Sequence, residues 1–415
     1  MKLFLLLISL LIDLYSANIS HLVKLRQENA ILTNNAKFQK ASIYAKLNLQ
    51  ADFEDGSRLV LISTLETDAK DKIEPSRYNL DKYNDFLKIL PLGTHGNLEL
   101  REFFYETEMK GSIIKLGKMQ TVWGKADGIK LIDRLNPQNF SEFILPSFEE
   151  SRIPLWTFSF LKSLDNSEFE FIAIIDNTRN KIPINGASFE FTSTKVIPQI
   201  PKNVPINKND VANPNNFILD SDVAFRYSKM LNNMEIGFYY FYLYNDNQTL
   251  SQKFDKTSNI LTITSKYERS SSYAFSMDYS KKNFVYRVET MLTNSDELSY
   301  IFGLDWYGLN QSLLSLQIFQ SYLLKDKNRF SRDKVDNTVT FLYKKDLMND
   351  TLHAELLTIH NINDNDGLIR PKLRYELDEE SVIYIGIDKF YGNKNGLYGE
   401  FRKQSRIILG VERTF

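Results

Sequence analysis

The segment Ile407-Ile-Leu-Gly-Val-Glu-Arg-Thr-Phe415 decides the fold that this sequence predicts. Side chains two positions apart share a chemical character. One face carries Ile407, Leu409, Val411 and Arg413, and the other carries Ile408, Gly410, Glu412 and Thr414. A period of two, with one mostly apolar face and one mostly polar face, predicts a β-strand that has a different environment on each side.

A strand of this kind that finishes on an aromatic residue resembles the last strand of outer-membrane β-barrels, where the assembly machinery reads the terminal residue. The resemblance implies that Phe415 is a barrel-assembly signal. It also implies that outer-membrane lipid and the barrel-assembly machinery are partners of the chain.

The composition fits an exported β-protein and excludes several classes of function. The 22 Tyr and 29 Phe favour strands and membrane-interface belts. With Lys+Arg at 51 and Asp+Glu at 52, the formal charge of -1 offers no basic field for nucleic acid. The lack of cysteine removes disulfides, thiolate nucleophiles and zinc–thiolate sites.

Residues 1–17 have the pattern of a cleaved signal peptide: one basic residue, an apolar run of about ten residues, and then small residues. Asp13 and Tyr15 depart from that pattern. The alternative is a short membrane anchor, for which the run is too short. Residues 18–41 lack period-two order, so we expect an N-terminal helical segment there.

Residues 42–415 predict an all-β fold, a transmembrane antiparallel up-and-down barrel. A clear example of the alternation is the segment 271–280, in which Tyr273, Phe275, Met277 and Tyr279 oppose Ser272, Ala274, Ser276 and Asp278. Such runs are about 9–12 residues long, as tilted membrane strands require, whereas globular strands average about 5–6. Long and short connections alternate, as in barrels with external loops and periplasmic turns.

The strand count follows from the alternation and from the lengths of the connections. Alternation marks candidate strands that start near 42, 57, 98, 111, 155, 167, 221, 234, 258, 271, 283, 298, 312, 335, 350, 368, 381 and 405. This set places the long 245–257 connection at the periplasmic end and the short 231–233 turn at the external end. One strand is therefore misassigned or that loop is atypical, and we expect about 16 strands, with 14 or 18 as alternatives.

Three insertions interrupt the strand pattern. Residues 67–97 include a stretch with helical spacing, and the proline-rich residues 177–220 predict an extended external loop. Residues 120–154 combine turn formers with charges that could pair with one another and hold a folded insertion. Its candidate constriction or plug residues are Trp123, Gly124, Asp127, Gly128, Asp133, Arg134, Asn136, Pro137, Glu142, Glu149, Arg152 and Pro154.

Several of these residues resemble, in their order, the hallmark of the domain-of-unknown-function 1302 family of bacterial outer-membrane proteins. They are Trp123-Gly124, Asp127-Gly128, Asp133, Asn136-Pro137, Glu142-Phe143 and Arg152-Ile-Pro154. The similarity is strong over 100–160, fair over 283–324 and the C-terminal strand, and weak elsewhere. Arg413 stands where the family usually has an aromatic or apolar residue. The resemblance implies a Gram-negative outer-membrane barrel and names no substrate.

Charged residues on the polar faces of the predicted strands should face the lumen. They are Arg287, Glu289, Asp305, Arg370, Lys372 and Arg374. Their mixed signs predict transverse charge segregation rather than a ring of one sign. The basic ladder at positions 370, 372 and 374 would either attract anionic solutes or pair with acidic residues of the 120–154 insertion, and we favour the pairing.

Nothing in the sequence predicts catalysis. It contains no G-x-S-x-G, H-E-x-x-H or phosphate-loop motif. His353 and His360 fall on opposite sides of one predicted strand and so cannot share a metal. We therefore expect no enzyme activity, no cofactor and no metal site.

The leading hypothesis is an outer-membrane, porin-like channel for the passive passage of small solutes. The aromatic residues of the 120–154 insertion would suit amphipathic or hydrophobic solutes, but buried packing explains them equally well. In this view the insertion is a constriction; as an alternative, it is a structural clasp. The alternative function is a non-conducting barrel, such as a sheath for a partner lipoprotein or electron carrier, or an adhesin. The sequence assigns neither the solute nor the oligomeric state.

Overall fold

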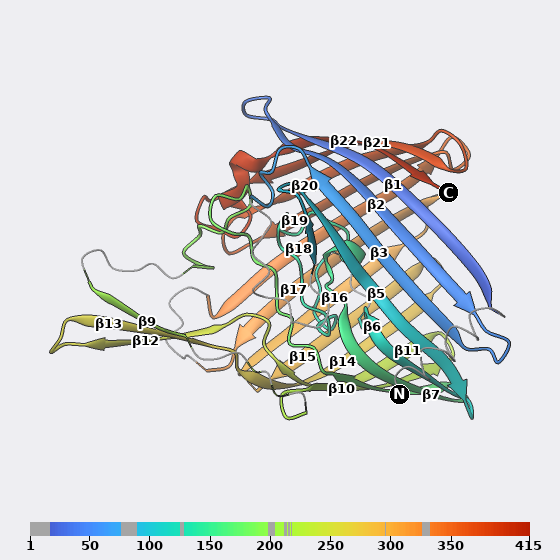
Figure 1. The fold of residues 1–415 in the computed structure, drawn as a ribbon, viewed down its shortest axis with the longest axis horizontal. Helices are drawn as coiled ribbons and strands as arrows, with labels where there is room; N and C mark the ends of the chain where they lie inside the picture. The colour runs from blue at the N-terminus through green and yellow to red at the C-terminus, as the bar shows by residue number, and fades with distance from the viewer. Residues whose placement is uncertain are drawn as a thin grey trace.

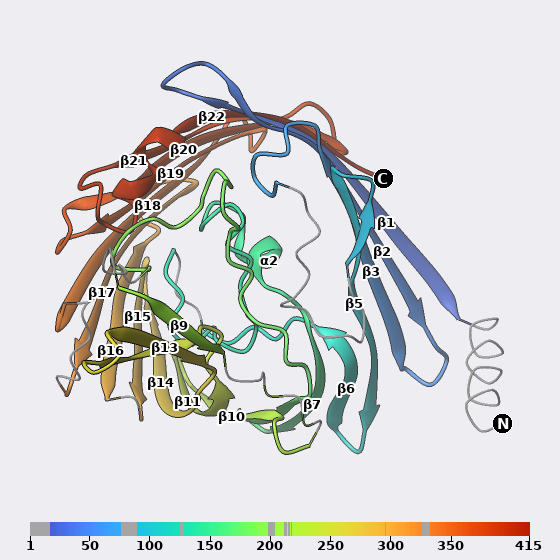
Figure 2. The same ribbon diagram turned by 60° about the vertical axis from the view of Figure 1, so that its left-hand side comes forward.

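The chain forms a closed, antiparallel β-barrel (Figures 1 and 2). The computed structural model describes residues 17–75, 89–124, 128–197, 204–210, 214, 216, 218–294, 296–325 and 333–415. The wall has 18 strands. These are β1 (Asn18–Leu32), β2 (Phe38–Asp52), β3 (Arg58–Asp68), β5 (Gly96–Met109), β6 (Ser112–Met119), β7 (Leu155–Leu164), β8 (Ser167–Ile174), β10 (Asp222–Leu231), β11 (Met234–Tyr244), β14 (Arg269–Lys281), β15 (Phe284–Thr293), β16 (Glu297–Trp306), β17 (Ser312–Leu323), β18 (Val335–Leu347), β19 (Leu352–Asn361), β20 (Asp366–Glu376), β21 (Ser381–Tyr391) and β22 (Arg406–Thr414).

The barrel closes where β1 pairs with β22. The antiparallel register runs from Lys24 opposite Thr414 to Leu32 opposite Arg406. Val23 and Phe415 extend the seam through two backbone hydrogen bonds of 3.1 and 2.8 Å. Closure leaves no wall strand with an unpaired edge, which is the condition for a sheet in a lipid environment.

The alternation predicted for β22 is confirmed. Ile407, Leu409 and Val411 are exposed on the outer face, whereas Ile408 and Glu412 are buried on the inner face. An apolar outer face around a polar interior reverses the pattern of a water-soluble barrel. The fold therefore fits an outer-membrane location. Among the described residues, no helix is long and apolar enough to cross a membrane.

The two ends of the barrel differ in the length of their connections. At one end, tight turns join strands in pairs, and Asp165, Asn232 and Lys282 take left-handed φ angles of 47°, 52° and 53° there. At the other end lie the long connections 69–95, 120–154, 175–221 and 245–268. This asymmetry matches the predicted pattern of short turns and long loops.

Two errors explain the wrong expectation of 16 strands. The predicted helical segment 18–41 is instead β1 and the start of β2. The predicted strand near 258 is β13 (Ile260–Lys266), which lies outside the wall in a sheet with β9 (Ile206–Asp210) and β12 (Thr249–Asp255). One strand was missed and one was wrongly included, so the candidate strands found by alternation were as many as the wall strands. The connections near residues 231–257 were nevertheless assigned to the wrong ends of the barrel.

The remaining elements lie at or inside the mouth with the long connections. The sheet of β9, β12 and β13 projects beyond the wall (Figure 1). Strand β4 (Leu90–Leu92) belongs to the 67–97 insertion and pairs with the start of the wall strand β5. The helix α2 (Phe148–Ser151) and the 3-10 helix η1 (Gly399–Gln404) are both short. The predicted signal peptide, residues 1–17, lies outside the described residues except for Ala17. The stretch with helical spacing in 67–97, Tyr78–Leu90, also lies outside them except for Ile89 and Leu90, and Leu90 begins β4.

Candidate functional site

The 120–154 insertion folds back into the barrel, where α2 lies within the ring of strands (Figure 2). Asn136 ties its two ends together: its amide accepts a hydrogen bond from the Thr121 N–H at 2.8 Å and donates one to the Ile153 carbonyl at 2.9 Å. The Pro137 carbonyl accepts a further hydrogen bond from the Ile153 N–H at 2.8 Å. The insertion is therefore a closed loop anchored on β6 and β7.

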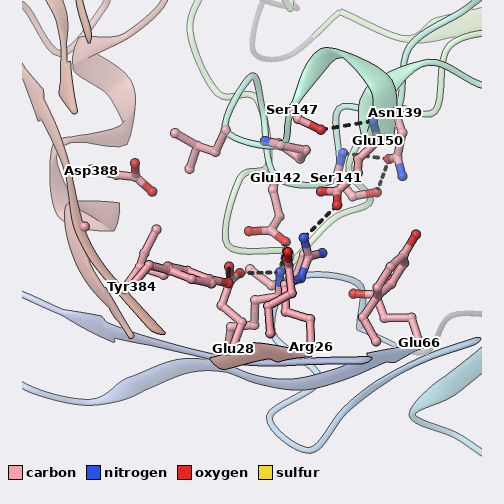
Figure 3. Close-up of a pocket in the computed structure, with 18 of the residues that line it drawn as sticks. Arg26, Glu28, Glu66, Asn139, Ser141, Glu142, Ser147, Glu150, Tyr384 and Asp388 are labelled. Atoms are coloured by element: carbon pink, nitrogen blue, oxygen red, sulfur yellow. Dashed lines mark hydrogen bonds and ion pairs between the residues drawn. The ribbon is translucent and has the colours of Figure 1, made fainter. Parts of the chain in front are cut away.

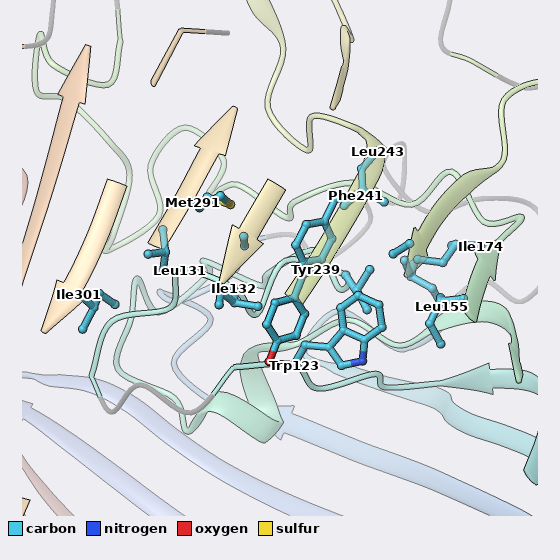
Figure 4. Packing of buried hydrophobic residues seen from close by; sticks show 14 residues of the cluster. Trp123, Leu131, Ile132, Leu155, Ile174, Tyr239, Phe241, Leu243, Met291 and Ile301 are labelled. Carbon is cyan, nitrogen blue, oxygen red and sulfur yellow. The ribbon is translucent and has the colours of Figure 1, made fainter. Parts of the chain in front are cut away.

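The first half of the insertion packs on one side of the barrel through apolar side chains (Figure 4). Trp123 is 2% exposed and its indole N–H donates to Glu170 on β8 at 2.8 Å. Gly124 has φ +89°, a backbone conformation that favours glycine, and a Cβ there would also lie 3.1 Å from the Glu289 carboxylate. The inner faces of β7 to β16 complete this cluster, which contains Trp123, Leu131, Ile132, Leu135, Leu155, Ile172, Ile174, Ala224, Tyr239, Phe241, Leu243, Ala274, Met291 and Ile301.

The second half of the insertion packs at the mouth. Phe143 and Leu145 join Phe189 of the 175–221 connection and Phe401 of η1 in a second apolar cluster. The Phe143 and Phe401 rings lie 4.8 Å apart between centroids. Part of the predicted external loop 177–220 therefore turns inward, because Phe189 is fully buried.

The charges of the insertion pair mostly with the wall and not, as predicted, with one another. Among the described residues of the insertion, the internal pairs meet at Asp133: Arg152 donates to its carboxylate at 2.8 and 2.7 Å, and the Lys130 ammonium lies 3.8 Å from it. Arg134 instead lies against Ser272 and Met291, and burial lowers the pKa of its guanidinium. The predicted pairing is confirmed for Asp133 and Arg152. It is wrong for the glutamates, because their partners lie on strands far away in the sequence.

Glu142 is the centre of a buried network that joins the insertion to the seam (Figure 3). Lys40 on β2 donates to it at 2.5 Å, and Arg406 on β22 lies 2.8 Å away. Burial alone would raise the pKa of Glu142, but Lys40 and Arg406 hold it below its ordinary value. Lys40 also pairs with Glu28 at 2.9 Å, and Arg406 with Asp388 at 2.9 Å. Each cation is thus shared by the wall and the insertion.

Three further cations hold α2 near the wall of β1, β2 and β5. Arg26 pairs with Glu150 and Lys46 with Glu149, each at 2.6 Å. Arg101 donates to the backbone carbonyls of Glu149 and Arg152 at 2.5 and 2.7 Å. A cation on these carbonyls is favourable because they end the helix.

Between α2 and this wall lies a polar cavity of about 470 Å³ (Figure 3). It is bounded by β1, β2, β3 and β5 on one side and by β19 to β22 on another. Its basic lining residues are Lys24, Arg26, Lys40, Arg101, Lys181, Arg370, Lys372, Arg374 and Arg406. Its acidic lining residues are Glu28, Glu66, Glu74, Glu99, Glu142, Glu150, Glu355, Asp388 and Glu412. The two sets are equal in number, so the lining is polar and close to neutral.

The predicted lumen charges divide between two regions. Arg287 pairs with Asp305 at 2.9 Å on the side filled by the insertion, where Glu289 also lies. Arg370, Lys372 and Arg374 line the cavity. Arg370 pairs with Asp388 at 2.8 Å and donates to the Leu145 carbonyl, and Arg374 lies 3.6 Å from Glu412. The acidic partners of Arg370 and Arg374 are therefore wall residues. The expected pairing of the basic ladder with acidic residues of the insertion is wrong for these two arginines.

Sequence analysis missed several cavity residues. Arg26 and Glu28 lie in the segment assigned to a helix, so their inward alternation on β1 was not recognised. Arg406 begins the strand whose alternation was recognised, and its inward position could have been inferred from that register. Among the predicted residues, Asp127 lies outside the described residues. The described residues contain no group of three His, Cys, Asp or Glu side chains that could hold a metal ion.

Comparison with known proteins identifies the fold. No family model matches the chain, and no curated protein matches it. Acinetobacter baumannii OccAB2 superposes with a TM-score of 0.54 at 10% identity, covering 96% of this chain and 98% of that one. Acinetobacter baumannii OccAB3 gives 0.53 at 12%, covering 97% and 99%. The outer membrane protein OpdK of Pseudomonas aeruginosa gives 0.51 at 10%, covering 97% and 99%. The likeness shows the fold.

Proposed function

We propose that this protein is an outer-membrane channel of the porin type, through which small polar solutes cross passively. The observation that carries the proposal is the charged cavity of about 470 Å³ that the folded insertion leaves inside the closed barrel. The fold shared with an outer membrane protein supports this assignment. In this proposal the 120–154 insertion narrows the lumen and sets the size of the solutes that pass.

The position of the aromatic side chains supports polar rather than hydrophobic solutes. Trp123 and Phe143 lie in packed clusters, 2% and 3% exposed, and neither lines the cavity. The cavity presents carboxylates, guanidinium groups and lysine side chains instead. An apolar solute would have to displace water from these groups without replacing their hydrogen bonds, which is unfavourable.

We also infer membership of the domain-of-unknown-function 1302 family and recognition of Phe415 by the barrel-assembly machinery. The Trp123-to-Pro154 motif supports the first inference, because its residues build the insertion. The position of Phe415 at the end of the closing strand supports the second. Substitution Phe415→Ala is expected to reduce the yield of assembled barrel in cells.

Planar-bilayer recording with the purified chain tests the channel. Discrete conductance steps that scale with salt concentration are expected, together with liposome swelling in small sugars and amino acids. Heat-denatured protein is the control for detergent leaks. A folded barrel that seals bilayers and gives no steps would contradict the channel and favour a structural barrel.

A further inference from the structure

Two polar side chains lie in an apolar region of the outer wall, at the seam where β1 pairs with β22. Gln27 lies opposite Val411 on β22 and Ile43 on β2, and both of these are exposed on the outer face. Asn29 lies opposite Leu409, which is exposed on the same face. Neither amide has a hydrogen-bond partner among the described residues. An amide that meets only hydrocarbon loses the hydrogen bonds that water would provide, which is unfavourable.

Gln320 on the outer face of β17 shows how the wall accommodates the same kind of side chain elsewhere. Its register partners are Tyr300 and Asn337. The Gln320 amide accepts a hydrogen bond from the Tyr300 hydroxyl and donates one to the side-chain oxygen of Asn337 at 2.6 Å. The barrel itself therefore satisfies Gln320, whereas Gln27 and Asn29 need a partner that the described wall does not supply.

The surface on either side of these two amides has a shape that fits another protein. On one side, a groove of about 340 Å³ runs over β20, β21 and β22, and Ile385 and Leu409 are among its mostly apolar lining residues. On the other side, Ile43 projects from β2 and is 54% exposed, with Ala41 and Ala45 next to it on the same row. Small side chains of this kind let two proteins approach closely within a membrane.

We propose that this surface binds a second copy of the chain and forms a dimer with a two-fold axis along the membrane normal. Such an axis relates two copies that point the same way in one membrane, and it places each residue beside the axis against its own mate at the same depth. An amide carries both donors and an acceptor, so Gln27 and Asn29 can each pair with their own mates, as a buried asparagine does in coiled coils.

The groove favours the same occupant. The two-fold axis turns β2 of one copy toward β21 of the other, so that Ile43 of each copy faces the groove of its partner. An acyl chain could fill the groove, but it offers no donor or acceptor to the two amides. The dimer does not depend on whether the barrel conducts.

The test counts the copies of the purified full chain in lipid bilayers by stepwise photobleaching. The chain has no cysteine, so Glu54→Cys in the exposed turn between β2 and β3 provides one labelling site. Energy transfer between labelled copies at increasing dilution in lipid gives the association constant. The variants Gln27→Leu and Asn29→Leu remove each amide, and Gln320→Leu is the matched control. Gel mobility with and without heating confirms that each variant is folded.

Two bleaching steps are expected for the wild-type chain. Each leucine variant at the seam should weaken association about tenfold, the contribution of a hydrogen bond within a membrane, whereas Gln320→Leu should associate as wild type does. Single steps at every density would overturn the dimer, and three or more steps would overturn the two-fold axis. Dimers that persist in the double leucine variant would overturn the contact through the amides. Single chains that carry a bound lipid in native mass spectrometry would assign the groove to lipid instead.

Discussion

The substitution Glu142→Gln probes whether the insertion is fastened by its buried ion pairs. Glu142 is 8% exposed and contacts Lys40 and Arg406 at 2.5 and 2.8 Å. Removing one partner of a buried pair costs about 3–5 kcal/mol. Lys40 keeps Glu28 and Arg406 keeps Asp388, so the lower end, about 3 kcal/mol, applies here.

Glu149→Gln is the matched control in the same insertion. Glu149 also contacts a cation, Lys46 at 2.6 Å, but its side chain is 64% exposed. Exposed pairs contribute about 0–1 kcal/mol. The same chemical change is therefore expected to loosen the insertion at the seam when it is made at Glu142 and to leave the insertion in place when it is made at Glu149.

Thiol labelling measures that release. The chain has no cysteine, so Ser141→Cys provides one reporter, buried at 3% exposure in the insertion. On this background, about 3 kcal/mol predicts that Glu142→Gln speeds labelling by about 100-fold, against less than about fivefold for Glu149→Gln. Channel noise should rise with the labelling rate. Equal labelling rates in the two variants would refute the idea that the ion pairs hold the insertion.

Acid should act on wild type as Glu142→Gln does. The pKa of Glu142 is lowered in the folded protein, so its pairs stabilise the insertion at any pH above the ordinary value of 4.5. That stabilisation is lost as the pH falls through the lower, folded-state pKa. Relative to Glu142→Gln at the same pH, which has no carboxylate to titrate, labelling of the wild-type reporter should accelerate as the pH falls below the ordinary value of 4.5.

Three further predictions concern the wall, the packed side of the lumen and the mouth. Gly410→Ala should lower the temperature at which the folded gel band is lost by more than Tyr384→Phe does. The added Cβ of alanine would lie 2.1 Å from the Tyr384 ring. Tyr384→Phe removes only the 2.7 Å hydrogen bond from the hydroxyl to Glu28, which contributes about 1.5–3 kcal/mol. Trp123→Ala should destabilise the insertion by about 3–5 kcal/mol and enlarge single-channel conductance; unchanged conductance would show that this half of the lumen stays closed without it. Burial raises the pKa of Asp246 from 3.8 to about 7, so the stability it confers is present below about pH 4 and is lost as the pH rises through 7. Asp246→Asn should therefore raise the unfolding temperature more at pH 8 than at pH 5, and an equal gain at both would count against this shift.

The strands with one apolar face could be predicted from the sequence, and β1 shows why others could not. Its inward residues include Arg26 and Glu28, as expected for a lumen wall. Its outward row includes Gln27 and Asn29, which are polar as well. They line a groove on the outer wall whose other lining residues, such as Leu409, are mostly apolar. Gln27 and Asn29 interrupt an outward row that also contains Leu25 and Ile31, so the period-two contrast is weakened in the middle of β1 and helix-forming residues dominate a local reading.

The strand β13 shows the opposite limit. Its alternation is real, and the residues 260–266 do form a strand. Periodicity reports that a segment is extended between two environments, but it does not identify the sheet in which the segment pairs. The lengths of the 231–233 turn and the 245–257 connection did indicate the error, because they placed a long loop at the end of the barrel that has short turns. All the residues from 245 to 268 form a single connection between the wall strands β11 and β14.

The insertion could be located from turn signals and charge density, but its partners could not, and they bear on how the barrel is built. Lys40 is 102 residues from Glu142 along the chain, and Arg406 lies near the opposite end of the sequence. These two cations converge only because β1 pairs with β2 on one side and with β22 on the other. Before β22 closes the seam, Glu142 can meet at most Lys40, and its burial would leave one of its two contacts unmade. The final docking of the insertion therefore depends on closure, and each docked insertion in turn holds β2 and β22 together through one carboxylate.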